Sequence, residues 1–512
     1  MAMMSNERIL SVFGEKSQTT EHAMQIRVES ENSNIERVLS VVAKANIEGV
    51  SVFEGELRGE GEVRVDVVYL GAEGEIFTTT QTAPLAISIK NDMFFANQTA
   101  NLFANIISAD VENVLQNEVI VSVVVGLTPF VCQTQDLKVF ESTNDAIKVK
   151  TQTNERTELV AVGNAVFSKD GKIQTNLPVS RVLANSANVV VNQARAFENY
   201  VAIEGDVIVE SVVALSDGEN TTYQTLKIEL PFDEQIEANG AVSDAQVLAA
   251  VRPVLSSLSV TAFEDKTENG VDVDVKIAAR VLVFEKTMFA AVGDAYGTEN
   301  QTFISTQTYK YLKECTKVSD KVKLESNLLL DADLARIDKV LFWQAPRATT
   351  TNTYIADDVL HIEGTVDVAI IYLNDENNQI SSYLANIPFA VEHRLAEPAG
   401  TDAIVDVDVN VVDLQVTARR GREIFVDAKL AYQATICVGG VDAVVSDVEL
   451  GEPLLISNSP IKIYYARAGQ TIWDVAKDMH VDQETIMRQN PDVEDVAFDG
   501  DKKIVFYKQK VK

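Results

Sequence analysis

Histidines and cysteines are the residues of this chain that could ligate a metal ion or pair a nucleophile with its base. The four histidines are His22, His361, His393 and His480, and none lies near a second ligand at the spacing of a metal-binding motif. The chain also lacks the motifs of phosphate-binding loops, serine-hydrolase nucleophile elbows and zinc proteases. The sequence therefore predicts no catalytic residue, no metal ion and no cofactor, and hence a protein that is not an enzyme.

The three cysteines, Cys132, Cys315 and Cys437, are far apart in the sequence. An odd and widely spaced set is not typical of a disulfide framework. The sequence predicts free, buried thiols in a reducing compartment.

Length and charge limit the class of protein. The 512 residues are too many for one hydrophobic core and indicate roughly three or four domains. With 76 acidic and 44 basic residues, the net charge is −32, which disfavours nucleic acid and anionic membranes but permits protein partners. Met1–Ala23 contains no apolar stretch of signal-peptide length, and the most apolar window, Val119–Leu127, is about half as long as a membrane helix. We therefore expect a soluble, cytoplasmic protein without a transmembrane segment.

A short block of sequence occurs three times in the first 460 residues. The three versions are Ile35–Leu39, Val179–Leu183 and Ile337–Leu341. A glycine follows each block at nearly the same distance, and a run of alternating β-branched and polar residues begins directly after it. The three glycines are Gly61, Gly205 and Gly364. Such a run is typical of a half-buried β-strand.

Each alternating run leads into a turn and then into a second predicted strand. The turns are clusters of glycine, aspartate and asparagine, which tolerate the positive φ of tight hairpins. The second strand contains one of three pairs: Pro84–Leu85, Pro231–Phe232 and Pro388–Phe389. Because proline cannot donate a hydrogen bond to a neighbouring strand, we expect it at a strand end or in an edge strand.

Alternation continues in the second half of each copy, for example in Val271–Phe284 and Ile404–Val412. Met93–Val114 in the first copy looks helical instead. The predicted fold is mainly β, with three tandem antiparallel β-sandwich-like domains followed by a small α/β module. The expected domains are residues 1–160, 161–320, 321–458 and 459–512.

The sequence changes in character from Ile461. Ile461–Ala466 reads as a strand, and Thr471 with Asp474 forms a capping box that begins a helix. Asp482 caps a second predicted helix, which must end near Asn490 because a proline follows. Lys503–Lys508 reads as a closing strand. The predicted order is strand, helix, helix, strand.

This order resembles a LysM module. The residues that match the family's pattern are Gly469, Thr471, Ile472, Trp473, Val481, Asp482, Asn490 and Pro491. Gln470 departs from the aspartate that is common at its position. The resemblance implies a partner-binding face made by Gly469, Gln470, Thr471, Ile472, Trp473, Asn490 and Pro491. Two roles for Trp473 stay open, since it can fill the small core or serve as a partly exposed interface anchor.

The upstream triplet resembles tandem SPOCS domains (DUF3794), although Leu85 stands where the family favours phenylalanine. Tandem SPOCS domains followed by one LysM module are similar to the SipL-type spore-coat morphogenetic proteins. This resemblance implies a non-enzymatic scaffold in the mother-cell cytoplasm, at the forespore surface and in the spore coat. It also implies that the LysM module recruits a protein partner, a SpoIVA-like coat morphogenetic ATPase.

Two alternative functions remain. A LysM module can bind peptidoglycan or a related glycan, which would require an export route. Repeated β-domains with free strand edges could also self-associate into a structural surface subunit.

Overall fold

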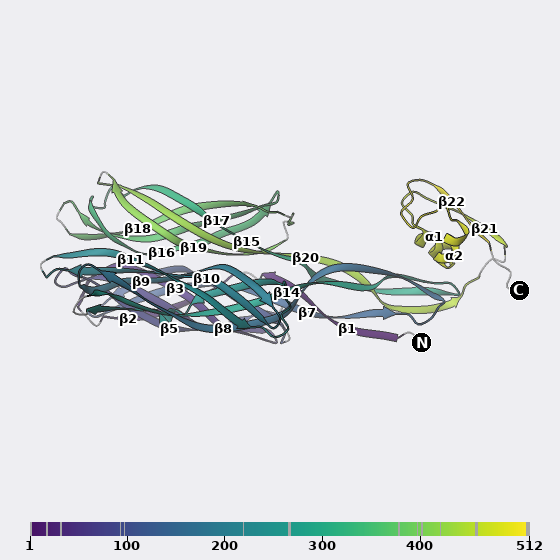
Figure 1. The fold of residues 1–512 in the computed structure, drawn as a ribbon, viewed down its shortest axis with the longest axis horizontal. Helices are drawn as coiled ribbons and strands as arrows, with labels where there is room; N and C mark the ends of the chain where they lie inside the picture. The colour runs from purple at the N-terminus through teal and green to yellow at the C-terminus, as the bar shows by residue number, and fades with distance from the viewer. Residues whose placement is uncertain are drawn as a thin grey trace.

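Figure 1 shows a computed structural model of the chain, which describes residues 3–507 except 17–18, 31–32, 93, 97, 219, 265–267, 377–378, 397, 401–402, 420 and 456–458. Antiparallel β-strands account for most of the described residues, and two short α-helices lie near the C-terminus. The predicted mainly β fold is confirmed. In Figure 1 the third copy lies above the first two, whose strands overlap in this view, and a narrow stalk extends from them toward the C-terminal module.

The first copy forms two sheets that enclose one hydrophobic core. Its strands are β1 (Met3–Lys16), β2 (Thr20–Glu29), β3 (Ile35–Phe53), β4 (Glu56–Gly71), β5 (Ile76–Lys90), β6 (Thr99–Val114) and β7 (Glu118–Glu141). One sheet has the order β3-β4-β5, and in the other β7 pairs with β1, β2 and β6. Val65 of β4 and Val123 of β7 are fully buried in the shared core. The helix expected over Met93–Val114 is wrong, because Thr99–Val114 pairs with β7 as a strand.

The second copy repeats this arrangement. Its elements are β8 (Ile147–Thr175), β9 (Val179–Phe197), β10 (Tyr200–Ser216), β11 (Thr221–Glu237), β12 (Gln246–Pro253), a 3-10 helix (Leu255–Ser257), β13 (Ser259–Glu264) and β14 (Asn269–Gly297). The sheet β11-β10-β9 faces a sheet in which β14 pairs with β8, β12 and β13. Val209 and Val275 are buried in the core between the two sheets.

The third copy has the same two-sheet construction. Its strands are β15 (Asn300–Leu329), β16 (Ile337–Ala356), β17 (Val359–Asn374), β18 (Ile380–Arg394), β19 (Ile404–Arg419) and β20 (Glu423–Pro453). The sheets are β16-β17-β18 and β15-β20-β19, and Val368 and Val426 lie in the core between them. The expected boundaries after residues 160 and 320 fall within β8 and β15, which are continuous strands.

The prolines of the repeat lie in outer strands. Pro84, Pro231 and Pro388 belong to β5, β11 and β18, and each of these strands ends the order of its three-stranded sheet. An outer strand has one side without a ladder partner in its sheet, so a missing N–H is tolerated there. The predicted edge position is confirmed.

The repeat's glycine lies opposite the residue that follows this proline. Gly205 pairs with Phe232, and Gly364 pairs with Phe389. A Cβ on either glycine would collide with a backbone carbonyl of the preceding strand and with the phenylalanine ring. The ring therefore covers the bare glycine backbone across the strands. In the first copy Leu85 takes the position of the ring.

We expect Gly205→Ala to lower the free energy of unfolding by about 1–3 kcal/mol, because the new methyl group would meet the Val190 carbonyl oxygen and the Phe232 ring. Gly49→Ala is the matched control, since Gly49 also lies in a strand and a Cβ there meets nothing within 4 Å. Urea denaturation of both variants measures the difference. Equal stability of the two variants would contradict the close contact at Gly205.

The sheets β3-β4-β5, β11-β10-β9 and β16-β17-β18 form a closed ring. Strand β5 lies against β9, β11 against β16, and β18 against β3. Between the first and second copies, Arg181 forms an ion pair with Glu75 at 2.7 Å and lies over the Phe77 ring. Between the second and third, the rings of Tyr223 and Phe342 are 5.5 Å apart.

The recurring sequence block supplies the centre of this ring, which we call the hub. Its buried side chains are Leu39, Val68 and Ile76 from the first copy, Leu183, Ala184, Val212 and Ala214 from the second, and Phe342 and Ile371 from the third. Leu39 and Leu183 end their blocks, and Phe342 directly follows its own. The basic residue of the first block also crosses to a neighbour, because Arg37 donates to the Ile380 carbonyl. The block therefore packs the copies against one another.

The hub buries the second face of the alternating strand β4, which was expected to face solvent. In β4, Val65 and Val67 face the core of their own sandwich, whereas Val68 faces the hub and is also fully buried. Asp66, on the hub side, is buried as well and accepts from Arg64 Nε at 3.1 Å. The prediction of a half-buried strand is wrong for this segment, because the polar face is covered by the other copies.

The long strands of the second sheets continue past the sandwiches and form the stalk in Figure 1. Three antiparallel ribbons build it: β1 with β7, β8 with β14, and β15 with β20. They share an apolar interior, in which Val139 of β7, Phe289 of β14 and Val444 of β20 pack together.

Cys315 of β15 and Cys437 of β20 are direct partners across one of these ribbons and form a disulfide. The prediction of free thiols is therefore wrong at both positions, and the reducing compartment inferred from them loses this support. The two residues are far apart in the sequence, and only the pairing of the first and last strands of the third copy brings them together. The side chain of Cys132 lies outside the described part.

Alkylation of the purified chain tests the disulfide. We expect iodoacetamide, applied under denaturing conditions without a reductant, to leave Cys315 and Cys437 unmodified. Both should be alkylated after reduction, and peptide mass spectrometry distinguishes the two states. Alkylation of both residues before reduction would contradict the bond.

The C-terminal module contains β21 (Ile461–Ala466), α1 (Ile472–Met479), α2 (Gln483–Gln489) and β22 (Lys502–Tyr507), with β21 and β22 paired. The predicted capping box is present: Thr471 Oγ1 accepts from the Asp474 N–H, and the Asp474 carboxylate accepts from the Thr471 N–H. Asp482 caps α2, and Asn490 ends it. The helix boundaries therefore follow the local cap signals in the sequence.

Candidate interaction site at the C-terminal module

The C-terminal module lies beside the far end of the stalk, where β14 finishes and β15 begins (Figure 1). Its small core is formed by both helices and the inner face of the β21–β22 sheet. One residue of the stalk, Tyr296 of β14, belongs to the same core. The module is therefore packed onto the stalk and not only tethered to it.

Helix α1 makes the main contact. The Trp473 side chain is only 5% exposed, and its ring meets the Tyr296 ring edge-on with the centroids 4.9 Å apart. Trp473 Nε1 donates to Asp294 Oδ2 at 2.7 Å, and Lys477 Nζ donates to the other carboxylate oxygen at 2.6 Å. One carboxylate of the stalk thus holds two side chains from successive turns of α1.

Further polar contacts surround this pair. The Tyr296 hydroxyl donates to the Val481 carbonyl at 2.8 Å, and His480 Nδ1 lies 3.0 Å from the Gly297 carbonyl oxygen. Lys148 and Asp482 form an ion pair at 3.1 Å. Burial raises the pKa of the Tyr296 hydroxyl well above its ordinary value, so this group is a neutral donor at physiological pH.

Asp294 is charged in this environment. Burial raises the pKa of its carboxyl group, but the hydrogen bonds from Lys477 and Trp473 and the charge of Lys477 outweigh burial and lower the pKa below 3.8. The ionised form accepts from both donors, so the contact persists at neutral and mildly acidic pH.

Several of the predicted partner-binding residues have structural contacts. Ile472 is fully buried in the module core, and Thr471 caps α1. The Asn490 side chain donates to the Ile486 and Val505 carbonyls at 2.8 Å each and accepts from the Val505 N–H, which ties α2 to β22. Trp473 faces the chain's own stalk, in contrast to the exposed anchor considered from the sequence.

The other predicted residues reach the surface. Gly469 and Pro491 are exposed and Gln470 is half-buried. Gly469 has φ +87°, which suits glycine, and its N–H donates to the Phe498 carbonyl at 2.8 Å. The structure thus divides the predicted face into a buried part that positions the module and an exposed part around Gly469 and Pro491.

Two stalk residues that contact the module, and the exposed apolar face of the β21–β22 sheet, were not predicted from the sequence. Asp294 and Tyr296 carry no local signal, because their partners lie nearly two hundred residues further along the chain. The outer face of the β21–β22 sheet exposes apolar side chains, namely Ile461, Ile463, Tyr465 and Tyr507. The alternation within Ile461–Ala466 was the available signal for this face.

The described residues contain no group of three or more histidine, cysteine or acidic side chains arranged to hold a metal ion. Neither α-helix in the described ranges has the length and apolar character of a membrane-spanning helix.

Comparison with known proteins gives one match. No curated protein and no solved structure matches this chain. The match starts just before the third sequence block and ends with β19, so it covers the sheet β16-β17-β18 and one strand, β19, of its partner sheet. Residues 336–419 match the family described as SipL, SPOCS domain.

Proposed function

We propose that this chain is a non-enzymatic adaptor of bacterial spore-coat assembly, located in the mother-cell cytoplasm at the forespore surface. The observation that carries the proposal is the match of residues 336–419 to the SipL, SPOCS domain family. The first two copies share its sequence block, its glycine-led strand and its two-sheet construction. In this proposal all three copies are SPOCS domains, and their ring is the rigid body of the adaptor.

In the same proposal the C-terminal module is a LysM module that recruits a protein partner, a SpoIVA-like coat ATPase. The stalk holds it away from the sandwiches (Figure 1), which leaves room for a large partner. The exposed loops around Gly469 and Pro491 are the proposed contact surface. Trp473 and Asp294 act indirectly, because they fix the orientation of the module.

The experiment measures binding of the full chain to purified SpoIVA-type ATPase by interferometry, and separately its retention on purified peptidoglycan. Pro491→Arg places a bulky charge on the exposed loop and should weaken ATPase binding at least tenfold. Leu384→Arg is the matched control, because Leu384 is 67% exposed on β18 and distant from the module in sequence and fold (Figure 1). Retention on peptidoglycan without ATPase binding would overturn the proposal in favour of a glycan-binding protein.

A further inference from the structure

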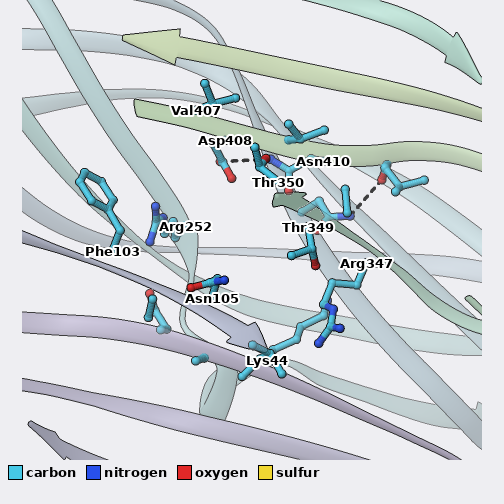
Figure 2. Close-up of a pocket in the computed structure, with 18 of the residues that line it drawn as sticks. Lys44, Phe103, Asn105, Arg252, Arg347, Thr349, Thr350, Val407, Asp408 and Asn410 are labelled. Carbon is cyan, nitrogen blue, oxygen red and sulfur yellow. Dashed lines mark hydrogen bonds between the residues drawn. The ribbon is translucent and has the colours of Figure 1, made fainter. Parts of the chain in front are cut away.

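A cavity of about 580 Å³ lies where the three copies meet. Figure 2 shows its lining, with side chains that converge from strands of different copies. Lys44 of β3, Asn188 of β9 and Arg347 of β16 all line it, and each pairs with the third residue after its copy's glycine. The cavity is therefore a product of the ring, since these three positions are equivalent in the repeat.

Each copy contributes a cation to this cavity. Lys44 comes from the first, Arg252 from the second and Arg347 from the third (Figure 2). In a chain with net charge −32, basic side chains that line one cavity would be expected to find carboxylate partners. Lys44 and Arg252 both lie in strand ladders, but neither the Lys44 nor the Arg252 side chain forms an ion pair or a hydrogen bond with another residue of the described ranges. Arg347 is paired with Asp367 at 2.8 Å, but its buried Nε has no acceptor among the described residues.

The acidic group with the strongest effect on Lys44 does not pair with it. Asp66 has the largest charge effect on Lys44. Its carboxylate accepts hydrogen bonds from Arg64 at 3.1 Å and from Thr80 at 2.6 Å. Burial lowers the pKa of Lys44 despite the opposing effects of Asp66 and Glu210, and the charge of Arg64 lowers it further. Burial therefore disfavours the charged form of Lys44, which a bound anion would stabilise.

The rest of the lining is polar, and it includes two carboxylates that a bound anion has to avoid. Asp406 and Asp408 also line the cavity, and the Asp408 carboxylate accepts from Asn410 Nδ2 at 3.2 Å. Hydroxyl groups of Thr349 and Thr350 supply further donors. The volume lies within the range typical of small-molecule sites.

We propose that this cavity binds a small ligand that presents a phosphate-class oxyanion to Lys44, Arg252 and Arg347. Ammonium and guanidinium groups form strong charge-assisted hydrogen bonds with such anions. Because the three cations come from three different copies, the bound anion bridges the ring and stabilises it as a unit. The inference is independent of the partner proposed for the C-terminal module.

The test uses the full chain with inorganic phosphate as the probe. Isothermal titration measures phosphate affinity directly, and the melting temperature is followed in phosphate and in sodium chloride of equal ionic strength. A ligand that binds only the folded state raises the melting temperature as its concentration increases. We expect phosphate to raise it and chloride to have no such effect, while Lys44→Gln and Arg252→Gln each reduce phosphate affinity about tenfold or more.

Lys317→Gln is the matched control, because burial also lowers the pKa of Lys317 but this residue does not line the cavity. It should retain wild-type phosphate affinity. Arg252→Gln keeps the test valid if Lys44→Gln is too unstable to titrate. Equal effects of phosphate and chloride would overturn the proposal, and so would equal phosphate affinity of the Arg252 and Lys317 variants.

Discussion

Leu183→Ala should lower the free energy of unfolding by about 2–5 kcal/mol. Leu183 ends the second sequence block and is 1% exposed in the hub. Truncation would leave a cavity among side chains from three copies, and the closed ring limits how far they can move to fill it. The loss should appear in urea denaturation as a lower midpoint.

Leu384→Ala is the control for this prediction, since it removes the same atoms from a side chain that is 67% exposed. It should change the unfolding free energy by less than about 0.5 kcal/mol. If Leu183→Ala is no more destabilising than Leu384→Ala, the copies do not pack through the hub.

Asp294→Ala should release the C-terminal module from the stalk. The substitution removes the acceptor of the hydrogen bonds from Trp473 and Lys477, each worth about 1.5–3 kcal/mol when a charged group takes part, and less here for the partly exposed Lys477. The chain has two tryptophans, so a Trp343→Phe background reports Trp473 alone. We expect its emission to shift to longer wavelength and iodide quenching to increase.

Glu449→Ala is the matched control, because Glu449 is an exposed carboxylate on β20 of the same stalk. It should leave the Trp473 emission unchanged. Unchanged emission in the Asp294 variant would show that the carboxylate does not hold the module.

The pKa of Asp294 fixes the pH dependence of this contact. Because its pKa is lower in the folded chain than the ordinary 3.8, the stabilisation is complete above that value and is lost as the pH falls through the lowered pKa. The Trp473 emission of the Trp343→Phe chain should therefore stay constant from neutral pH down to about pH 4. A shift near pH 6 would point to a different titrating group.

Many elements of this fold were predictable from local patterns, although β6 was predicted as a helix. The alternation after Gly205 identified β10, the proline in β11 identified an outer strand, and the Thr471 capping box located the start of α1. These signals are local, because strand period, proline chemistry and helix caps depend on neighbours within a few residues.

The relations between copies were not predictable. The sequence block could be recognised as a repeat, but no pattern in Val179–Leu183 predicts that its leucine contacts residues of the other two copies. The same limit explains the disulfide between Cys315 and Cys437, which depends on the register of β15 against β20. It also explains Trp473, whose partner Asp294 is distant in sequence.

The most direct test of the adaptor account compares the full chain with a chain that lacks Ile461–Lys512. The three sandwich cores contain no residue of the removed segment, so the shortened chain should retain cooperative unfolding and the β-type circular dichroism spectrum. The measurement is the affinity of both chains for purified SpoIVA-type ATPase. The account predicts binding by the full chain and at least a hundredfold weaker binding by the shortened, folded chain. Equal affinity of the two would contradict it, and would place the partner surface on the ring or the stalk.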